Sequence, residues 1–331
     1  MKSWAALLTA VFVGVGSAHA QVSAQVSAQV GSDFPNKPVR LIVPFPAGGP
    51  TDINARVVAQ KLSEAWGKAV IVENRPGADT IIGAQAVAHA EPDGHTLLVA
   101  ADSTLTVNQF KHRDLPYDPH KDFAPITLLF KNTTLLVVRS DGPATVPDLI
   151  AKARANPGKL NYGAGLAANR LAGYLFVEKS GIDVQFIAYK GGGDTATALL
   201  NGSIDFSVDS VAANLPLIQS GQLRALAKIS SSVQLPALPE LQSLSVAARM
   251  PDLEDISTWA GLVAPAGTPQ PVIDQISRDV ARAYADPAVV EKLQKAGIGA
   301  AASSPAEFDT FIRAEATRWQ EAMKNGKVKL D

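Results

Sequence analysis

The stretch Pro44-Phe45-Pro46-Ala47-Gly48-Gly49-Pro50-Thr51-Asp52 decides how this sequence is expected to fold. It joins an apolar run over residues 39–45, typical of a strand, to residues 53–66, where apolar side chains recur at helical spacing. Two glycines let backbone N–H groups approach a ligand closely, and a helix N-terminus presents unpaired N–H donors. The junction therefore predicts an anion-binding loop, with a plain tight turn capped by Thr51 or Asp52 as the alternative.

The same succession of strand, turn and helix repeats along the chain, which predicts an α/β fold with parallel or mixed sheets covered by helices. The predicted strands are 39–45, 69–73, 96–101, 128–130, 135–138, 160–163, 184–190, 204–209, 223–229 and 259–263. The predicted helices are 53–66, 80–90, 147–155, 171–179, 195–200, 211–220, 272–284, 288–295 and 305–324. No strand is predicted between the last three helices, so we expect them to pack back on the first domain.

Length and composition narrow the possible functions. With 331 residues, two domains are expected, and 18% charged against 47% hydrophobic residues excludes disorder driven by charge. Thirty basic against 31 acidic residues give no electrostatic reason to expect a nucleic acid or an anionic membrane as partner. The absence of cysteine excludes disulfides and thiolate chemistry.

The N-terminal residues have the features of an export signal. Lys2 precedes an apolar run over residues 4–16, and Ser17-Ala18-His19-Ala20 offers a small-residue cleavage site. The run is shorter than the ~20 residues that span a bilayer. We therefore predict a signal peptide at 1–20, and the near-repeated Val-Ser-Ala-Gln that follows predicts a disordered tether at 21–33.

Four further turns follow predicted strands in the same way as the first loop. They are 75–80 (RPGADT), 101–104 (ADST), 163–165 (GAG) and 191–194 (GGGD). Because ligands of α/β sheets bind beyond the carboxyl ends of the strands, these turns and the first loop are expected to converge on one cleft.

Enzymatic readings have little support in the residues. The Gly163-x-Gly165-x-x-Ala168 spacing fits a loose dinucleotide-binding motif, but the next strand ends in Tyr189-Lys190 instead of an acidic residue. The sequence contains neither a Gly-x-Ser-x-Gly elbow nor a His-Glu-x-x-His zinc motif. We therefore predict no catalytic residue, no cofactor and no metal.

Several segments, taken in order, resemble the Bug-type solute-binding receptors of tripartite tricarboxylate transporters. They are PFPAGGPTDINAR (44–56), ENRPGADTIIGAQAVAHAEPDGHTLLVA (73–100), LPYDPHKDFAPIT (115–127), AYKGGGDTATALLNGSIDF (188–206), GQLRALA (221–227) and WAGLVAPAGTP (259–269). The resemblance runs from Phe34 to about Trp319. It implies the type II periplasmic binding-protein fold, two α/β domains with a ligand cleft between them.

The resemblance also implies boundaries, ligand and site. Domain 1 would comprise 34–134 with 258–331, and domain 2 would comprise 135–257. A monomer in the periplasm would capture a small organic acid through its carboxylate and deliver it to membrane permease subunits. The implied ligand-binding residues are Phe45, Ala47, Gly48, Gly49, Thr51, Asp52, Ser103, Thr104, Gly163, Ala164, Tyr189, Gly191 and Asp209.

The chain departs from the family pattern in two places that bear on the ligand. One is a looser stretch around 236–245, where the family has a proline-threonine motif after the sixth or seventh strand. Relatives usually carry a serine and a Ser/Thr-x-x-His arrangement within 162–172, where this chain has Ala164, Asn169 and Arg170. Arg170 either pairs with a second carboxylate or lies on the solvent side of its helix. Two other functions share many of these features: a periplasmic ligand sensor for a membrane signalling protein and, with less support, a secreted α/β enzyme.

Overall fold

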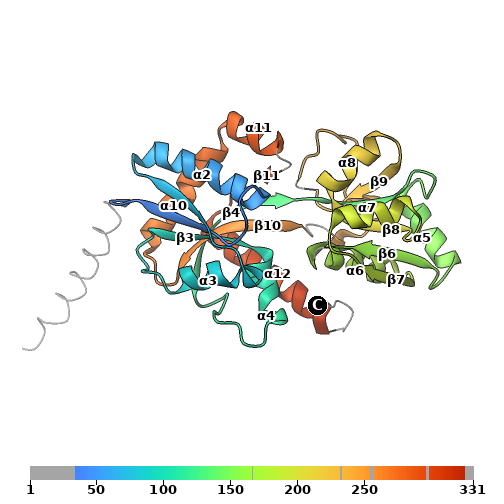
Figure 1. Ribbon diagram of the computed structural model, residues 1–331, viewed down its shortest axis with the longest axis horizontal. Coiled ribbons are helices and arrows are strands. Elements are labelled where there is room, and N and C mark those ends of the chain that lie inside the picture. Colours follow the sequence, from blue (N-terminus) through green and yellow to red (C-terminus); the bar gives the residue numbers. More distant parts are fainter. Residues whose placement is uncertain (1–33, 166, 232, 254–256, 296–297, 325–331) are drawn as a thin grey trace, which may run out of the picture.

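Two separate β-sheets organise the chain into two lobes, drawn left and right in Figure 1. The computed structural model describes residues 34–165, 167–231, 233–253, 257–295 and 298–324. The predicted signal peptide (1–20) and tether (21–33) lie outside the described residues. Among the helices in these ranges, none combines the length and the apolar character that crossing a bilayer requires.

The first lobe is built on a six-stranded mixed sheet with the order β11-β4-β10-β3-β1-β2. β1 pairs in parallel with β2 and β3, whereas β10 runs antiparallel to β3 and β4. The strands are β1 (Val39–Val43), β2 (Val70–Asn74), β3 (Thr96–Ala101), β4 (Phe123–Asn132), β10 (Thr258–Pro265) and β11 (Gly299–Ala300). The helices are α2 (Pro50–Trp66), η1 (Ala78–Thr80), α3 (Ile81–Ala88), η2 (Ser103–Val107), α4 (Asn108–Lys111), α10 (Gln270–Tyr284), α11 (Pro287–Lys295) and α12 (Pro305–Lys324).

The second lobe is built on a five-stranded sheet with the order β7-β6-β8-β5-β9. β6 pairs in parallel with β7 and β8, and β5 runs antiparallel to β8 and β9. The strands are β5 (Thr134–Arg139), β6 (Leu160–Ala164), β7 (Val184–Ala188), β8 (Phe206–Ser210) and β9 (Leu223–Lys228). The helices are α5 (Val146–Ala155), α6 (Ala167–Ser180), α7 (Gly192–Leu200), α8 (Val211–Gln219), α9 (Leu244–Ala247) and η3 (Pro251–Leu253). The predicted two-domain α/β fold is confirmed.

Each sheet is covered on both faces, because successive side chains of a strand point to opposite sides. In β1, Leu41 and Val43 join the cluster formed with α2 and α10, whereas Ile42 joins the cluster formed with α3 and α12. In β5, Leu136 faces α5 and α6, and Leu135 faces α7. These apolar runs therefore form two sandwiched cores, one in each lobe.

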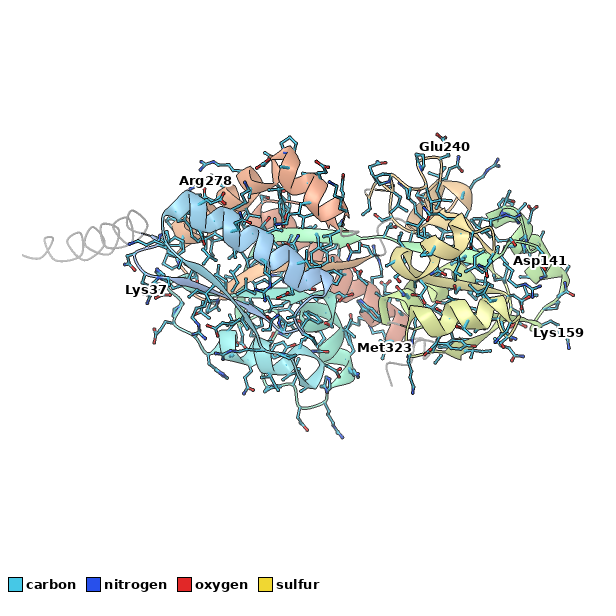
Figure 2. All side chains as sticks on the ribbon, turned by 45° about the horizontal axis from the view of Figure 1, so that its top comes forward. Lys37, Asp141, Lys159, Glu240, Arg278 and Met323 are labelled. Atoms are coloured by element: carbon cyan, nitrogen blue, oxygen red, sulfur yellow. The ribbon has the colours of Figure 1, made fainter. Side chains whose placement is uncertain are left out.

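Two strand crossings and the end of α12 connect the lobes in the described part of the chain. β4 ends at Asn132 and β5 begins at Thr134, and the returning strand pairs Thr258 with Asn132, so the two crossings lie side by side. The third connection is the end of α12, where buried Trp319 packs in one apolar cluster with Val107 of the first lobe and Leu171 of the second. Figure 2 shows Met323, near the end of α12, beside the second lobe.

Two differences from the predicted segments have one cause. The strand predicted at 128–130 extends over 123–132, and an unpredicted two-residue strand at Gly299–Ala300 separates α11 from α12. Both are set by pairing with distant segments, since β4 follows β10 along its length and β11 pairs with Lys131 and Phe130. Local periodicity carries no information about such partners.

Candidate functional site between the lobes

The loop over 44–52 connects the end of β1 to the start of α2, as predicted. Gly49 is the N-cap with extended backbone, Pro50 is the first helical residue, and no side chain caps this helix end. Gly48 has a φ of +88°, a backbone conformation that favours glycine. Ala47 and Gly48 are exposed, whereas the Phe45 side chain is half-buried against the core of the first lobe. The loop therefore leaves the N-terminal end of a 17-residue helix open.

Asp52 fixes the shape of this loop. Its carboxylate accepts hydrogen bonds from the Gly48 N–H (2.9 Å), from Arg56 Nε (2.9 Å) and from Asn74 Nδ2 (2.8 Å). Burial raises the pKa of Asp52, but these three donors outweigh it and the pKa lies below its ordinary value. The side chain is 2% exposed and its oxygens are already engaged, so it braces the loop and we leave its carboxylate out of the ligand set.

The turn after β3 carries Ser103 and Thr104, both predicted site residues. Thr104 is fully buried, and its Oγ1 donates to Thr80 Oγ1 over 2.9 Å. Its carbonyl accepts from the Tyr117 hydroxyl (2.8 Å). Ser103 is half-buried and its N–H donates to Asp102 Oδ1 (2.7 Å). Thr104 thus joins this turn to the neighbouring turn over 77–80, while Ser103 keeps part of its surface exposed.

The turn over 77–80 has an unusual backbone that sequence reasoning did not foresee. Ala78, Asp79 and Thr80 all have positive φ, at 45°, 52° and 77°. Such conformations are strained in residues with side chains and persist only where the surroundings fix them. Here Asn108 Nδ2 donates to the Asp79 carbonyl (2.7 Å), and Lys111 Nζ lies 2.9 Å from the Asp79 carboxylate. The network holds this turn beside α4 and the turn that follows β3.

Asp102, which follows the end of β3 and is the N-cap of η2, was also missed. Burial raises its pKa to about 7, and the nearby carboxylate of Glu315 on α12 adds to the shift. Glu315 itself is buried and is paired with Arg318. The signal in the sequence is weak, because Glu315 lies more than 200 residues from Asp102 and only the packing of α12 brings the two together.

The second lobe brings its predicted residues together at the ends of β6, β7 and β8. The Tyr189 N–H donates to the Ala164 carbonyl (3.1 Å), and a Cβ placed on Gly163 would lie 3.1 Å from the Tyr189 ring. A Cβ on Gly165 would lie 2.6 Å from the Gly191 Cα, so the two turns touch through their backbones. Glycine is needed at 165 because of this close approach.

Asp209 braces the second lobe through hydrogen bonds to its carboxylate, as Asp52 braces the first loop. Its Oδ1 accepts from Asn169 Nδ2 (3.2 Å) and from the Ser210 N–H (2.7 Å), and its Oδ2 accepts from Thr195 Oγ1 (2.5 Å). Burial raises its pKa, against the effect of the Thr195 and Ser210 hydrogen bonds. The carboxylate ties the starts of α6, α7 and α8 into one wall. It is 1% exposed, so we assign it to bracing that wall.

A cavity of about 830 Å³ lies between the two lobes. Its lining includes Pro50 of α2 and Asn132 of β4 from the first lobe, and Asn169 of α6 and Ser210 before α8 from the second. The thirteen predicted residues are not themselves among its lining residues, although Pro50 adjoins Gly49 and Thr51, and Ser210 adjoins Asp209. The first loop and the end of β8 therefore border this cavity, which extends toward the crossing at Thr133 and Thr134. The turns over 75–80, 101–104, 163–165 and 191–194 contribute no residue to its lining.

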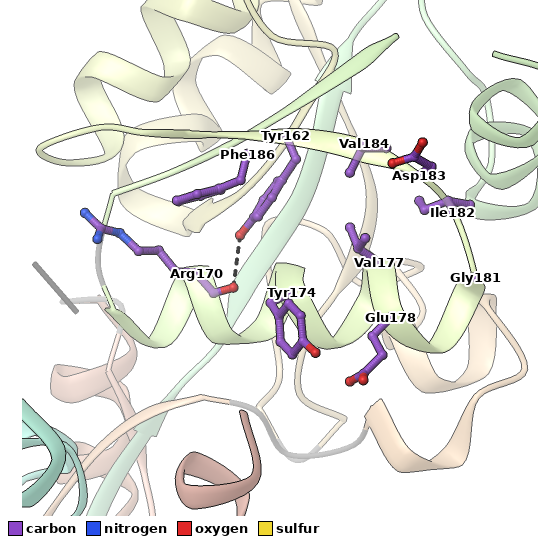
Figure 3. A pocket seen from close by; sticks show the side chains of 10 residues that line it. All are labelled: Tyr162, Arg170, Tyr174, Val177, Glu178, Gly181, Ile182, Asp183, Val184 and Phe186. Carbon is purple, nitrogen blue, oxygen red and sulfur yellow. Dashed lines mark hydrogen bonds between the residues drawn. The ribbon is translucent and has the colours of Figure 1, made fainter. Parts of the chain in front are cut away.

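Arg170 points to a different pocket. This pocket, of about 510 Å³, lies within the second lobe beside α6, β6 and β7 (Figure 3). Arg170 Nε donates to the Gly165 carbonyl (3.1 Å), and its guanidinium lies 5.9 Å from the centre of the Phe186 ring. In Figure 3 the side chains of Arg170 and Phe186 lie on the same side of α6. Arg170 lines this pocket and is not among the residues that line the cavity between the lobes.

No group of three or more His, Cys, Asp or Glu side chains in the described ranges could hold a metal ion.

Comparisons with known proteins agree with the two-lobed architecture. A family model described as "Tripartite tricarboxylate transporter family receptor" matches residues 54–327. BugT from Bordetella pertussis is 33% identical over 324 residues, which cover 97% of this chain and 96% of BugT.

Two solved structures extend the comparison to three dimensions. An R. palustris protein with adipate is 31% identical, covers 88% of this chain and 98% of its own, and gives a TM-score of 0.69. A TctC solute-binding protein from Polaromonas, with no ligand, is 26% identical. The match covers 88% of this chain and 99% of the Polaromonas chain, with a TM-score of 0.77. With the family model matched over most of its length, this chain belongs to the receptor family of the tripartite tricarboxylate transporters.

Proposed function

We propose that this chain is a periplasmic solute-binding receptor that captures a small organic acid between its lobes, 34–134 with 258–331 and 135–257, and delivers it as a monomer to membrane permease subunits. One observation carries the proposal. Pro50, in the first turn of α2, and Ser210, the N-cap of α8, come from opposite lobes and line the same 830 Å³ cavity. The positive ends of two helices therefore border one space large enough for a small ligand.

The carboxylate of the acid would bind at the start of α2. The first intrahelical bond runs from the Ile53 N–H to the Gly49 carbonyl, so the Thr51 and Asp52 amides have no partner within the helix. Gly49 contributes a third amide at the N-cap. The Gly48 amide is already donated to Asp52, which leaves one donor fewer than the loop sequence offers.

The available donors are sufficient for useful affinity. A hydrogen bond to a charged group contributes about 1.5–3 kcal/mol, and a micromolar complex needs about 8 kcal/mol. Three amides at the helix start with one or two donors from the second lobe reach that range before the costs of ordering are subtracted. Ser103, Gly163, Ala164, Tyr189 and Gly191 are the proposed residues around the remainder of the acid.

Closure of the lobes would then exclude water from the carboxylate and strengthen each hydrogen bond. The closed form is the state that a permease could distinguish from the empty receptor.

Gly49 provides the test of the carboxylate site. Its extended N-cap backbone suits Asp and Asn, and a Cβ there would lie 3.9 Å from the nearest atom beyond its chain neighbours, the Pro46 carbonyl oxygen. Gly49→Asp should fold at least as well as the wild type but repel a carboxylate. Gly49→Asn is the matched control, since it caps the helix without the charge.

The experiment begins with a thermal-shift screen of organic acids, followed by calorimetry with the acid that stabilises the chain most. We expect Gly49→Asp to bind this acid at least tenfold more weakly than Gly49→Asn. Equal affinity of the Asp variant and the wild type would refute the assignment of the carboxylate to this loop.

A further inference from the structure

Asn169 has a position that the carboxylate site does not use. It lies in the first turn of α6, is 1% exposed and lines the cavity between the lobes. Its Nδ2 donates to Asp209 Oδ1 over 3.2 Å. Its Oδ1 is buried and has no hydrogen-bond partner among the residues that the structure describes.

The neighbours of Asp209 fix which way the Asn169 amide points. Asp209 Oδ1 accepts from the Ser210 N–H and Oδ2 accepts from Thr195, so both oxygens of this carboxylate face donors. An ionised carboxylate can only accept, and the amide nitrogen is the only end of the Asn169 side chain that donates. The nitrogen must therefore face Asp209, and the oxygen must face away from it.

This arrangement makes the Asn169 oxygen a strong acceptor. A carboxylate that accepts from an amide N–H polarises that amide and increases the negative charge on its oxygen. A buried acceptor without a donor is costly, so whatever fills the space next to it should supply one. On the other side of the same cavity, Asn132 Oδ1 of β4 is also buried without a hydrogen-bond partner in the described part of the chain.

We propose that Asn169 makes this receptor select acids that carry a hydroxyl or amino group beside the carboxylate, by accepting a hydrogen bond from that group. The inference rests on the proposed function and adds the class of solute to it. The carboxylate binds at the positive end of α2 on the first lobe, and the donor group meets the negatively polarised amide oxygen on the second. An acid without such a donor group would leave the Asn169 oxygen unpaired.

The test compares acids that differ only in the donor group. Binding to the purified chain is measured by calorimetry for succinate, malate and aspartate, and for glutarate, 2-hydroxyglutarate and glutamate. Asn169→Leu removes the acceptor at similar side-chain volume. Thr195→Val is the matched control, because it removes another hydrogen bond to Asp209 and leaves the Asn169 oxygen in place.

We expect the wild type to bind the hydroxy or amino member of at least one series tenfold or more tightly than the unsubstituted acid. Asn169→Leu should abolish this ratio, whereas Thr195→Val should keep it even if all affinities fall together. The wild-type ratio needs no variant, so a folding defect of Asn169→Leu cannot obscure the answer.

Three results would overturn the inference. If succinate and glutarate bind as tightly as their substituted counterparts, the proposed function stands and the role of Asn169 is wrong. If the preference survives in Asn169→Leu, another residue selects the donor group. If none of the six acids binds, the proposed capture of small acids fails together with this inference.

Discussion

The Tyr284 hydroxyl donates a 2.9 Å hydrogen bond to Asn54 Oδ1, which joins α10 to the first turns of α2 across 230 positions of sequence. Asn54 is fully buried and Tyr284 is 9% exposed. The helix that presents the proposed carboxylate site is thereby held from the far end of the chain. Burial of the phenol also raises the pKa of Tyr284, so it remains a donor at all physiological pH values.

Removal of this hydroxyl should destabilise the first lobe. Tyr284→Phe leaves Asn54 Oδ1 buried and unpaired, which costs about 1–3 kcal/mol of unfolding free energy. Urea denaturation measures the loss. The double variant Tyr284→Phe with Asn54→Leu should recover part of it, since replacing both partners leaves no orphaned acceptor. Additive losses in the double variant would contradict a direct bond.

Asp52 should make stability depend on acid pH. Its folded pKa lies below the unfolded value of about 3.9, so the stabilisation is complete above pH ~4 and is lost as the pH falls through the folded pKa. Asp52→Asn should lose about 1–3 kcal/mol at pH 7, and the difference from wild type should shrink at pH 3.

Urea titrations at pH 7, 5 and 3 check this expectation. Asp309→Asn is the control, because that carboxylate pairs with Arg313 on the exposed face of α12 and should change stability by no more than about 0.5 kcal/mol. A constant difference between wild type and Asp52→Asn at the three pH values would argue against the assigned role.

Asp102 should act in the opposite direction. Its folded pKa of about 7 lies above the unfolded value of about 3.9, so the folded state holds the proton more tightly. Stability should then fall as the pH rises from about 4 to 7 and level off above. Asp102→Asn resembles the protonated acid, and it should match the wild type near pH 4 and exceed it at pH 8 by about 1 kcal/mol or more.

Chemical denaturation of the two proteins between pH 4 and 8 measures the expected divergence. Glu315 of α12 acts on Asp102 and is itself paired with Arg318, and both residues are unchanged in the variant. Parallel curves over the whole range would show that Asp102 titrates normally.

The backbone contact between Gly165 and Gly191 should distinguish two glycines that look alike in sequence. A Cβ on Gly165 would come within 2.6 Å of the Gly191 Cα, whereas a Cβ on Gly191 would meet nothing within 4 Å. Gly165→Ala should therefore cost about 1–3 kcal/mol and weaken solute binding, because the turns that form the wall of the second lobe must separate.

Gly191→Ala, at a φ of 179°, should stay within about 0.5 kcal/mol of the wild type. Thermal denaturation of both variants decides the matter. If the two substitutions have equal effects, the close approach at Gly165 is not what requires glycine there.

Local sequence patterns were sufficient for most of the elements and for the fold class. α12 occupies 305–324 and β3 occupies 96–101, as predicted. The spacing of apolar residues within each element is enough to predict its buried face. The position of the first loop at a strand–helix junction could also be predicted from neighbouring residues, because Gly48, Gly49 and Pro50 interrupt the strand and begin the helix. Strand lengths fixed by partners far along the chain, as in β4 and β11, were not accessible in this way.

The roles of individual site residues needed the tertiary structure. The family resemblance implied that Asp52 and Asp209 are ligand-binding residues, whereas the local sequence left Asp52 open as a cap of its helix. Folding brings each to three donors, two of them from other side chains, and that pairing makes both of them braces. Sequence alone determined where backbone amides are free to bind a ligand, since the starts of helices follow from local composition. Only the packing of distant segments decided which polar atoms have no partner within the protein and can bind a solute.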